Sequence, residues 1–371
     1  MLSKHFGTNW FTTVMGVGIV AALTYASPVP VPGQHGLGIV LFALTNVVFV
    51  VATTLWLHRW AVHTREALDD FRHPTRALYW GALAMGLNVV GNDYLIVGSH
   101  VLPPHLAIAI SQGFWIVGVA VSLFTVVTVP YLLFLAHRVT VTDTLASWLI
   151  PVVPPIVAAA TGSSLLPTWG SAAVERSLTA LIIAMFGITF FLFLMVSAMV
   201  YARLVYHQRL EGANVPSLWV EIGPIGMSMA IFSTLPLTAA HAAGPLLQPI
   251  LAAGGVFAMA MWGLGAWWIV ISSLHTLLHL GPRGDGIPFH LGWWSYVFPI
   301  GSFTTGTDAL THLTHWSLFT DAGFVQLLML WGCFAVVFVR TVKGALDGSL
   351  LGGHQPLRRW RLTPQRAAEN S

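Results

Sequence analysis

The sequence predicts an all-α polytopic membrane protein whose ten transmembrane helices form five helical-hairpin repeats. Three observations support this: an apolar composition, ten apolar stretches of membrane-spanning length, and basic residues confined to alternate loops. Hydrophobic residues make up 56% of the 371 residues and charged residues only 8%, whereas soluble domains contain about 25% charged residues. The 16 Lys and Arg and 13 Asp and Glu residues are too few to cover a water-facing surface of this size.

Ten stretches are long and apolar enough to cross a bilayer, which requires about 20 predominantly apolar residues. Asp93 and Asp308 are the only charged residues within them. We therefore expect one transmembrane domain over residues 1–343, followed by a polar cytoplasmic tail over residues 344–371. The stretches are 10–26, 37–57, 78–98, 105–135, 145–161, 177–202, 222–240, 250–274, 291–311 and 322–339.

The basic residues fix the orientation of these spans. All of the 16 Lys and Arg residues except Arg176 fall on one side of the membrane when ten spans are drawn. The positive-inside rule makes that side cytoplasmic, so we expect a multi-pass protein of the plasma (inner) membrane with both termini in the cytoplasm. The basic charge belongs to these loops, and we expect no nucleic-acid partner. Lys4 and the apolar run up to Ala26 also resemble a signal peptide, but this run belongs to the repeat described next, which favours a retained helix.

The odd-numbered spans share a repeated pattern, a Trp near the cytoplasmic end followed by Gly or Pro. The Gly or Pro positions are separated by 70, 68, 70 and 75 residues. The spacing predicts that the odd helices line a central pore and that the even helices lie outside them. The pairs are Trp10 and Gly16, Trp80 and Gly86, Trp148 and Pro154, Trp219 and Pro224, and Trp293 and Pro299.

Five helix breakers at one depth indicate a polar path. A breaker frees backbone N–H and C=O groups, which are tolerated in a membrane only where protein or water satisfies them. The alternative is that Gly and Pro merely permit close helix packing. On the pore interpretation, the residues before the breakers project towards the axis and form a dry constriction that resists hydrated ions. They are Met15, Met85, Val153, Gly223 and Phe298.

The predicted path carries little charge, which bears on what it selects. No span contains Lys or Arg, and no acidic ring of the kind found in cation channels is present. Backbone dipoles and hydroxyl groups remain as partners for a weakly held anion. Asp93 and Asp308 lie towards the extracellular ends of their spans, where each is either a proton site, as intramembrane carboxyl groups often are, or part of an outer vestibule.

Other chemistry finds little support in the sequence. The single cysteine, Cys333, excludes an intrachain disulfide and a cysteine-based cluster. The His275/His279 and His312/His315 pairs lie at opposite membrane faces and cannot share one metal, so we expect neither a metal nor another cofactor, and a haem-containing redox enzyme is disfavoured. The chain has no GxxxxGK[ST] motif, and its cytoplasmic loops are too short for a catalytic domain. We therefore expect that the protein is not an enzyme.

Two of the repeat copies resemble signatures of a known family. Residues 9–20, NWFTTVMGVGIV, are similar to the first-helix signature of the tellurite-resistance/dicarboxylate transporter family, and residues 293–301, WWSYVFPIG, to its ninth-helix signature. The family includes bacterial tellurite-resistance channels, fungal malate permeases and sulfite pumps, and the slow anion channel of plant guard cells. The resemblance extends over all ten spans, although Val17 stands where the malate and sulfite branch usually has Thr.

The resemblance implies a homotrimer with a separate pore in each protomer, through which small anions pass. It also implies that a phenylalanine of the ninth helix closes the pore, and Phe298 matches that position. The expected function is therefore a membrane anion channel or transporter for small anions such as chloride, nitrate, sulfite or C4-dicarboxylates such as malate. The alternative is a proton-coupled secondary transporter or exporter of a C4-dicarboxylate or sulfite.

Overall fold

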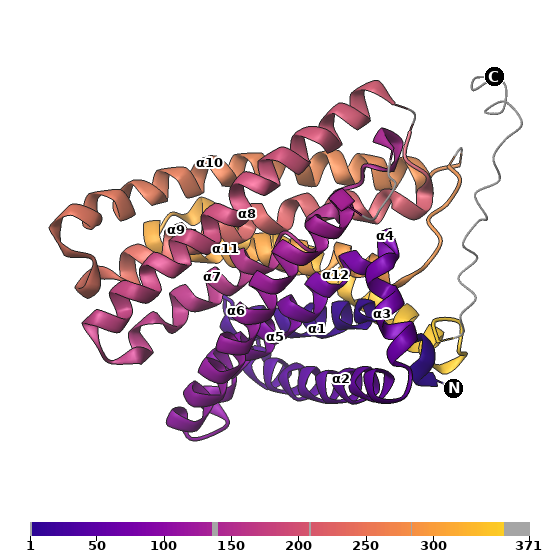
Figure 1. Ribbon diagram of the computed structural model, residues 1–371. Coiled ribbons are helices and arrows are strands. Elements are labelled where there is room, and N and C mark those ends of the chain that lie inside the picture. Colours follow the sequence, from indigo (N-terminus) through magenta and orange to yellow (C-terminus); the bar gives the residue numbers. More distant parts are fainter. Residues whose placement is uncertain (1, 136–139, 208, 283, 352–371) are drawn as a thin grey trace, which may run out of the picture.

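The computed structural model describes residues 2–135, 140–207, 209–282 and 284–351, and every regular element within these ranges is helical. Several long helices, among them α8 and α10, run roughly side by side, and α6 runs obliquely to α2 (Figure 1). The α-helices are α1 (Phe11–Ala26), α2 (Gln34–Val62), α3 (Thr64–Arg72), α4 (Pro74–Leu78), α5 (Trp80–Ile96), α6 (Pro104–Leu135), α7 (Pro154–Leu165), α8 (Ala172–Tyr206), α9 (Ile222–Thr238), α10 (Ala240–Leu280), α11 (Phe298–Thr314) and α12 (Ser317–Leu346). The 3-10 helices are η1 (Leu2–His5), η2 (Thr8–Trp10), η3 (Gly98–His100), η4 (Val141–Asp143), η5 (Ala146–Leu149), η6 (Leu166–Trp169), η7 (Gly212–Glu221) and η8 (Leu291–Tyr296).

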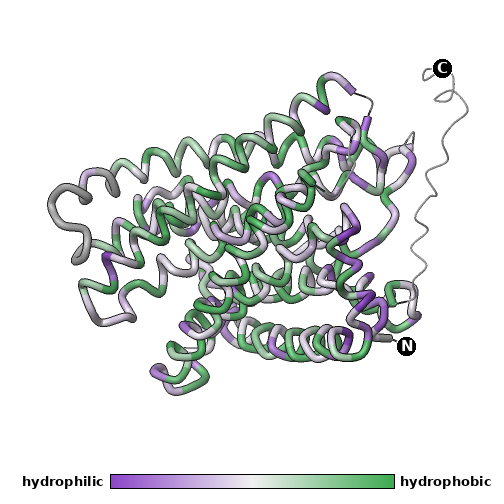
Figure 2. The backbone as a smooth tube through the Cα atoms, in the orientation of Figure 1, coloured by the Kyte–Doolittle hydropathy of each residue, from purple (hydrophilic) through white to green (hydrophobic). Residues whose placement is uncertain are grey.

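Seven helical segments of the described chain are long and apolar enough to cross a membrane. Hydrophobic residues follow the long helices, and hydrophilic residues gather at their ends (Figure 2). The other three predicted spans contain the shorter helices α5, α7 and α11, of 17, 12 and 17 residues. The seven segments are Thr8–Ala26, Gln34–Val62, Pro104–Leu135, Ala172–Tyr206, Gly212–Thr238, Ala253–Leu280 and Ser317–Leu346.

Five helices form a closed ring, which we call the inner ring. Each of α1, α5, α7, α9 and α11 contacts the next, and α11 contacts α1 again. The outer helices α2, α6, α8, α10 and α12 pack against α1, α5, α7, α9 and α11 in the same order. Burial follows this division, because 83% and 89% of the apolar windows of the segments containing α1 and α9 are buried, against 28% to 33% for the outer helices.

The structure corrects the expected form of several inner-ring helices. The sequence predicted continuous spans over 145–161 and 291–311, but a 3-10 segment (η5 or η8) precedes the α-helix in each. Pro154 and Pro299 lie in the first turn of α7 and α11, where a missing N–H costs nothing because that N–H has no partner within the helix. Gly16 and Gly86 lie inside α1 and α5, which continue through them without a break.

An ion pair attaches the short helices α3 and α4 to the end of α2. Arg59, only 3% exposed, donates hydrogen bonds of 2.5 and 3.1 Å to the carboxylate of Asp70 in α3. The Asp70 carboxylate also pairs with Arg76 of α4 at 3.2 Å. The desolvated Arg59 is therefore compensated only while Asp70 stays in place.

Candidate functional site

On α9, contacts with α10 determine which way Gly223 faces. A Cβ atom built on Gly254 of α10 would lie 2.6 Å from the ring of Phe232, so Phe232 faces that outer helix. Gly223 precedes Phe232 by nine residues, which amount to about two and a half helical turns. Gly223 therefore lies on the opposite face of α9, towards the interior of the inner ring.

The same reasoning applies to α7 and α5. A Cβ on Gly162 would lie 2.9 Å from a tryptophan of the outer helix α6, and Val153 precedes Gly162 by nine residues, so Val153 faces the interior. On α5, Gly86 faces α1 and Gly81 faces the backbone of the segment before α7. Met85 lies between these two directions and also faces the interior.

On α11, two glycines fix the direction of Phe298. A Cβ on Gly301 would lie 2.8 Å from Ile19 of α1, and one on Gly306 would lie 2.7 Å from Met229 of α9. At about 100° per residue, Gly301 and Gly306 flank Phe298 by about 60° on one side and about 80° on the other. Phe298, 3% exposed, therefore points between its two ring neighbours.

On α1, Met15 lies between two packed glycines. A Cβ on Gly16 would clash with the ring of Trp294 of η8, and one on Gly18 would lie 2.5 Å from Val89 of α5. Gly16, like Gly86, thus faces a neighbouring element. Met15 points between the directions of Gly16 and Gly18 and faces the interior. All five residues that precede the predicted breakers share this inward orientation.

The levels of Gly223 and Phe298 along the ring also agree. Gly226 of α9 lies against the backbone of Ser302 and Phe303 of α11, and Gly306 lies against Gly226 and the next turn of α9. The two helices therefore run in parallel with a fixed register. Three residues back from Gly226, Gly223 lies level with Pro299 and Ile300, within about half a helical turn of Phe298.

The space beside Gly223 is unfilled. A Cβ built on Gly223 would meet no heavy atom within 4 Å, although the residue itself is buried. Of the described glycines with as much free space, Gly223 is the only buried one, and the others lie on exposed or half-buried surface. Because protein interiors are otherwise close-packed, this is a distinct opening inside the inner ring.

Several residues on the interior faces of α1 and α9 are slightly exposed. Met15 and Ile19 are each 6% exposed, whereas Val17 on another face of α1 is 0% exposed. Met227 and Ala230, which follow Gly223 at helical spacing, are each 5% exposed. The helical period is the sequence signal for Ile19, Met227 and Ala230, because they follow Met15 and Gly223 at helical spacing.

Exposure on the interior faces increases towards the C-terminal ends of α7, α9 and α11. Ala160 of α7, Thr234 of α9 and Thr305 of α11 lie on these faces and are half-buried, and Ser164 near the end of α7 is exposed. The most buried part of the interior faces is therefore at the starts of α7, α9 and α11, near Phe298.

The two carboxyl groups predicted from the sequence lie between the ring and the outer helices. Asp93 is 0% exposed, and a Cβ on Gly18 would lie 2.8 Å from its Oδ2 and 3.2 Å from Thr45 of α2. Neither Asp93 oxygen has a hydrogen-bond partner among the described residues. Asp308 is half-buried, and a Cβ on Gly323 of α12 would lie 2.6 Å from its Oδ1. The structure does not bring either carboxyl group to the side of Phe298.

A polar cluster that the sequence analysis missed lies near the starts of α9 and α11. Arg209 donates to His279 Nε2 at 3.2 Å and to Asp285 at 3.2 Å, and His279 Nδ1 donates to the same carboxylate. This bond from His279 holds the pKa of Asp285 below its ordinary value. His290 donates through Nε2 to the Ala213 carbonyl at 2.9 Å and accepts from the Gly292 N–H at 3.0 Å, while burial lowers its pKa.

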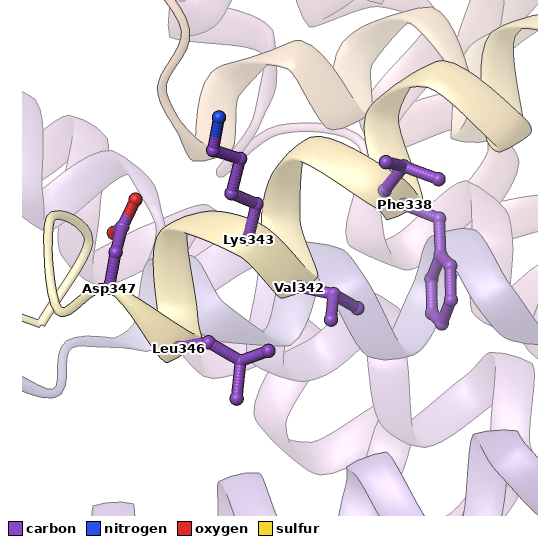
Figure 3. Close-up of a pocket in the computed structure, with 6 residues that line it drawn as sticks. Phe338, Val342, Lys343, Leu346 and Asp347 are labelled. Carbon is purple, nitrogen blue, oxygen red and sulfur yellow. The ribbon is translucent and has the colours of Figure 1, made fainter.

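A surface groove of about 600 Å³ is separate from this interior. Figure 3 shows its lining side chains along one helix, α12. Several of them are exposed, so the groove lies on the outer surface of the molecule. Its lining residues are Phe338, Val339, Val342, Lys343, Leu346 and Asp347.

Apolar segments of membrane-spanning length around a closed ring of helices indicate a multi-pass membrane protein. The model of the SLAC1 family, voltage-dependent anion channel, matches residues 5–342. The chain belongs to this family. The match confirms the family resemblance seen in the sequence, and the protein is an anion channel or transporter.

Relatives over nearly the whole chain agree with this class. An uncharacterized transporter of Methanocaldococcus jannaschii is 26% identical, over 95% of this chain and 96% of its own length. The sulfite efflux pumps of Arthroderma otae and Trichophyton rubrum are 28% and 27% identical, each over 91% of this chain and 90% of their own lengths. The family and these relatives are of the transporter type.

Proposed function

We propose that the protein conducts small anions through a pore along the interior of the inner ring, in each protomer of a homotrimer. Chloride, nitrate, sulfite and C4-dicarboxylates such as malate are the candidate substrates. The ten predicted segments all span the plasma membrane, as five helical hairpins with both termini in the cytoplasm. The observation that carries the proposal is the open space at Gly223, at the level of Phe298 and inside a closed ring of helices.

Helix dipoles account for a preference for anions. The helices α7, α9 and α11 all begin at the end of the inner ring where Phe298 lies, and the N-terminus of a helix carries a partial positive charge. Asp93 and Asp308 face the outer helices, so the interior faces described above carry no carboxylate to oppose this potential. A weak positive potential without a fixed cation suits an anion that must both enter and leave.

In this proposal Phe298 is the gate. The pore is lined at its narrow end by Met15, Met85, Val153 and Gly223, next to the breakers Gly16, Gly86, Pro154, Pro224 and Pro299. Three of the four lining residues are apolar side chains that keep the constriction dry, and Phe298 is large enough to fill the remaining opening.

Flux measurements in proteoliposomes test the proposal. The purified protein is reconstituted, and influx of chloride, nitrate, sulfite, malate and succinate is followed with and without a pH gradient. We expect flux of at least one of these anions, and a reversal potential in a salt gradient close to the anion equilibrium potential. A reversal potential close to the cation value would refute anion conduction.

A proton-coupled carrier for sulfite or a C4-dicarboxylate is the second candidate. The unpaired, buried carboxyl group of Asp93 favours it, because such a group can bind and release a proton, and sulfite efflux pumps are among the relatives. In this mechanism a pH gradient alone drives anion uptake, and Asp93→Asn abolishes that uptake. Asp308→Asn makes the same substitution at the other carboxyl group and is the matched variant for Asp93→Asn.

A further inference from the structure

The open space at Gly223 does not stabilise the packed protein. A glycine within a helix loses more conformational freedom on folding than a larger residue does. An unfilled volume also deprives its neighbours of dispersion contacts. Gly16, Gly81, Gly226 and Gly301 of the inner ring each lie so close to a neighbour that an added Cβ would clash, and a Cβ on Gly86 would be in ordinary contact at 3.7 Å. Gly223 permits no such close approach, so its lack of a side chain serves something else.

The position of this space relative to Phe298 suggests its use. Gly223 lies at the level of Phe298, on the neighbouring helix of the ring, and both face the interior. Towards α1, the backbone at Gly301 is already in close contact with Ile19. Towards the next turn of α9, the backbone at Gly306 is in close contact with Met229. Of these three glycines, only Gly223 has no heavy atom within 4 Å of its Cβ position.

We propose that the space above Gly223 receives the ring of Phe298 when the constriction opens. This inference depends on the anion pore and gate proposed above and names the residue that lets the gate move. A phenylalanine side chain changes position by rotating between staggered χ1 wells. Such a rotation needs an empty volume beside the helix, because a close-packed neighbour would block it. Gly223 thus determines whether the gate can open in a protein that has phenylalanine at position 298.

A double-mutant cycle separates this role from a simple effect of pore width. Anion flux is measured in proteoliposomes for the native protein, Gly223→Val, Phe298→Ala and the Gly223→Val/Phe298→Ala double variant. If the space receives the ring, Gly223→Val lowers flux about tenfold or more in the native background. In the Phe298→Ala background the same substitution lowers flux by no more than about twofold, since no ring has to move.

Gly263→Val is the matched control. Gly263 lies on the outer helix α10, is exposed, and also has no heavy atom within 4 Å of its Cβ position. The control therefore reports the effect of a β-branched residue in a helix, and its flux should equal that of the native protein. Elution volume and thermal unfolding confirm that each variant is folded, and Gly223→Ala replaces Gly223→Val in the cycle if the valine variant does not fold.

Two outcomes overturn the inference. An equal reduction of flux by Gly223→Val in both backgrounds means that the residue only sets the pore width. Unchanged flux in Gly223→Val means that the space is not used. Absence of anion flux in the native protein would instead refute the proposed function, and a Phe298→Ala variant without increased flux would refute the gate.

Discussion

Replacing Phe298 by alanine distinguishes a gate from a packing residue. Phe298 is 3% exposed. A fully packed phenylalanine costs about 3–5 kcal/mol of unfolding free energy when truncated to alanine, through lost transfer energy and a new cavity. In the gate proposed above, one side of Phe298 faces the open space at Gly223, so fewer contacts are lost on truncation, and we expect a cost of roughly 1–3 kcal/mol.

Phe303 on the same helix is the matched control. It is 1% exposed, faces the outer helix α10 at Gly265 and stacks near Trp262 with ring centroids 6.4 Å apart. Phe303→Ala should therefore cost the full amount of about 3–5 kcal/mol without opening the pore. The two substitutions remove the same atoms, one from the interior face and one from the outer face of α11.

Thermal unfolding in detergent and anion flux in proteoliposomes measure the two effects. We expect Phe298→Ala to be the more stable variant of the two and to conduct anions faster than the native protein. Phe303→Ala should be the less stable one, with flux per folded protein unchanged. A folded Phe298→Ala protein with native or lower flux, or a Phe303→Ala protein with increased flux, would contradict the reasoning.

Three further predictions follow from other parts of the molecule. Asp70→Asn leaves Arg59 buried without its carboxylate and should lower the unfolding free energy by about 3 kcal/mol. Asp69→Asn affects only the exposed pair with Arg72 and should change the unfolding free energy by less than about 1 kcal/mol. Equal melting temperatures of the two variants would disprove this difference. Burial lowers the pKa of His290 from 6.5, so the unfolded chain binds more protons just below that pH, and stability falls as the pH falls through this window. The fall in melting temperature between about pH 7.5 and pH 5.5 should be smaller in His290→Gln, and an identical fall would rule out this residue as a cause. A cysteine at Pro167 should be labelled from outside intact cells and one at Arg72 should not, and the opposite pattern would reverse the topology.

A spacing of about 70 residues marks five equivalent positions in the sequence, and the helices that contain them contact one another in a closed ring. Pro154 and Pro299 start helices where kinks were expected. A proline is compatible with both geometries, so the sequence alone does not distinguish them.

The sequence could not predict which way Asp93 and Asp308 face. Hydropathy gives the depth of a residue in a span, but the rotation of a helix depends on which neighbours pack against it. Gly18 of α1 makes room for Asp93 of α5, and Gly323 of α12 makes room for Asp308 of α11. The cluster of Arg209, His279 and Asp285 likewise depends on loops that meet only in the folded protein.

The contact between α1 and α11 has a consequence for biosynthesis. The ring closes only when the last helices reach the first, as in the hydrogen bond of 3.1 Å from Trp331 to Thr24, which joins residues 307 positions apart. At a synthesis rate of about 5–20 residues per second, α1 waits roughly 15–60 s in the membrane before its partner leaves the ribosome. During that time one side of the interior is open to lipid, so a nascent chain stalled before α11 exposes a surface that membrane quality control can recognise.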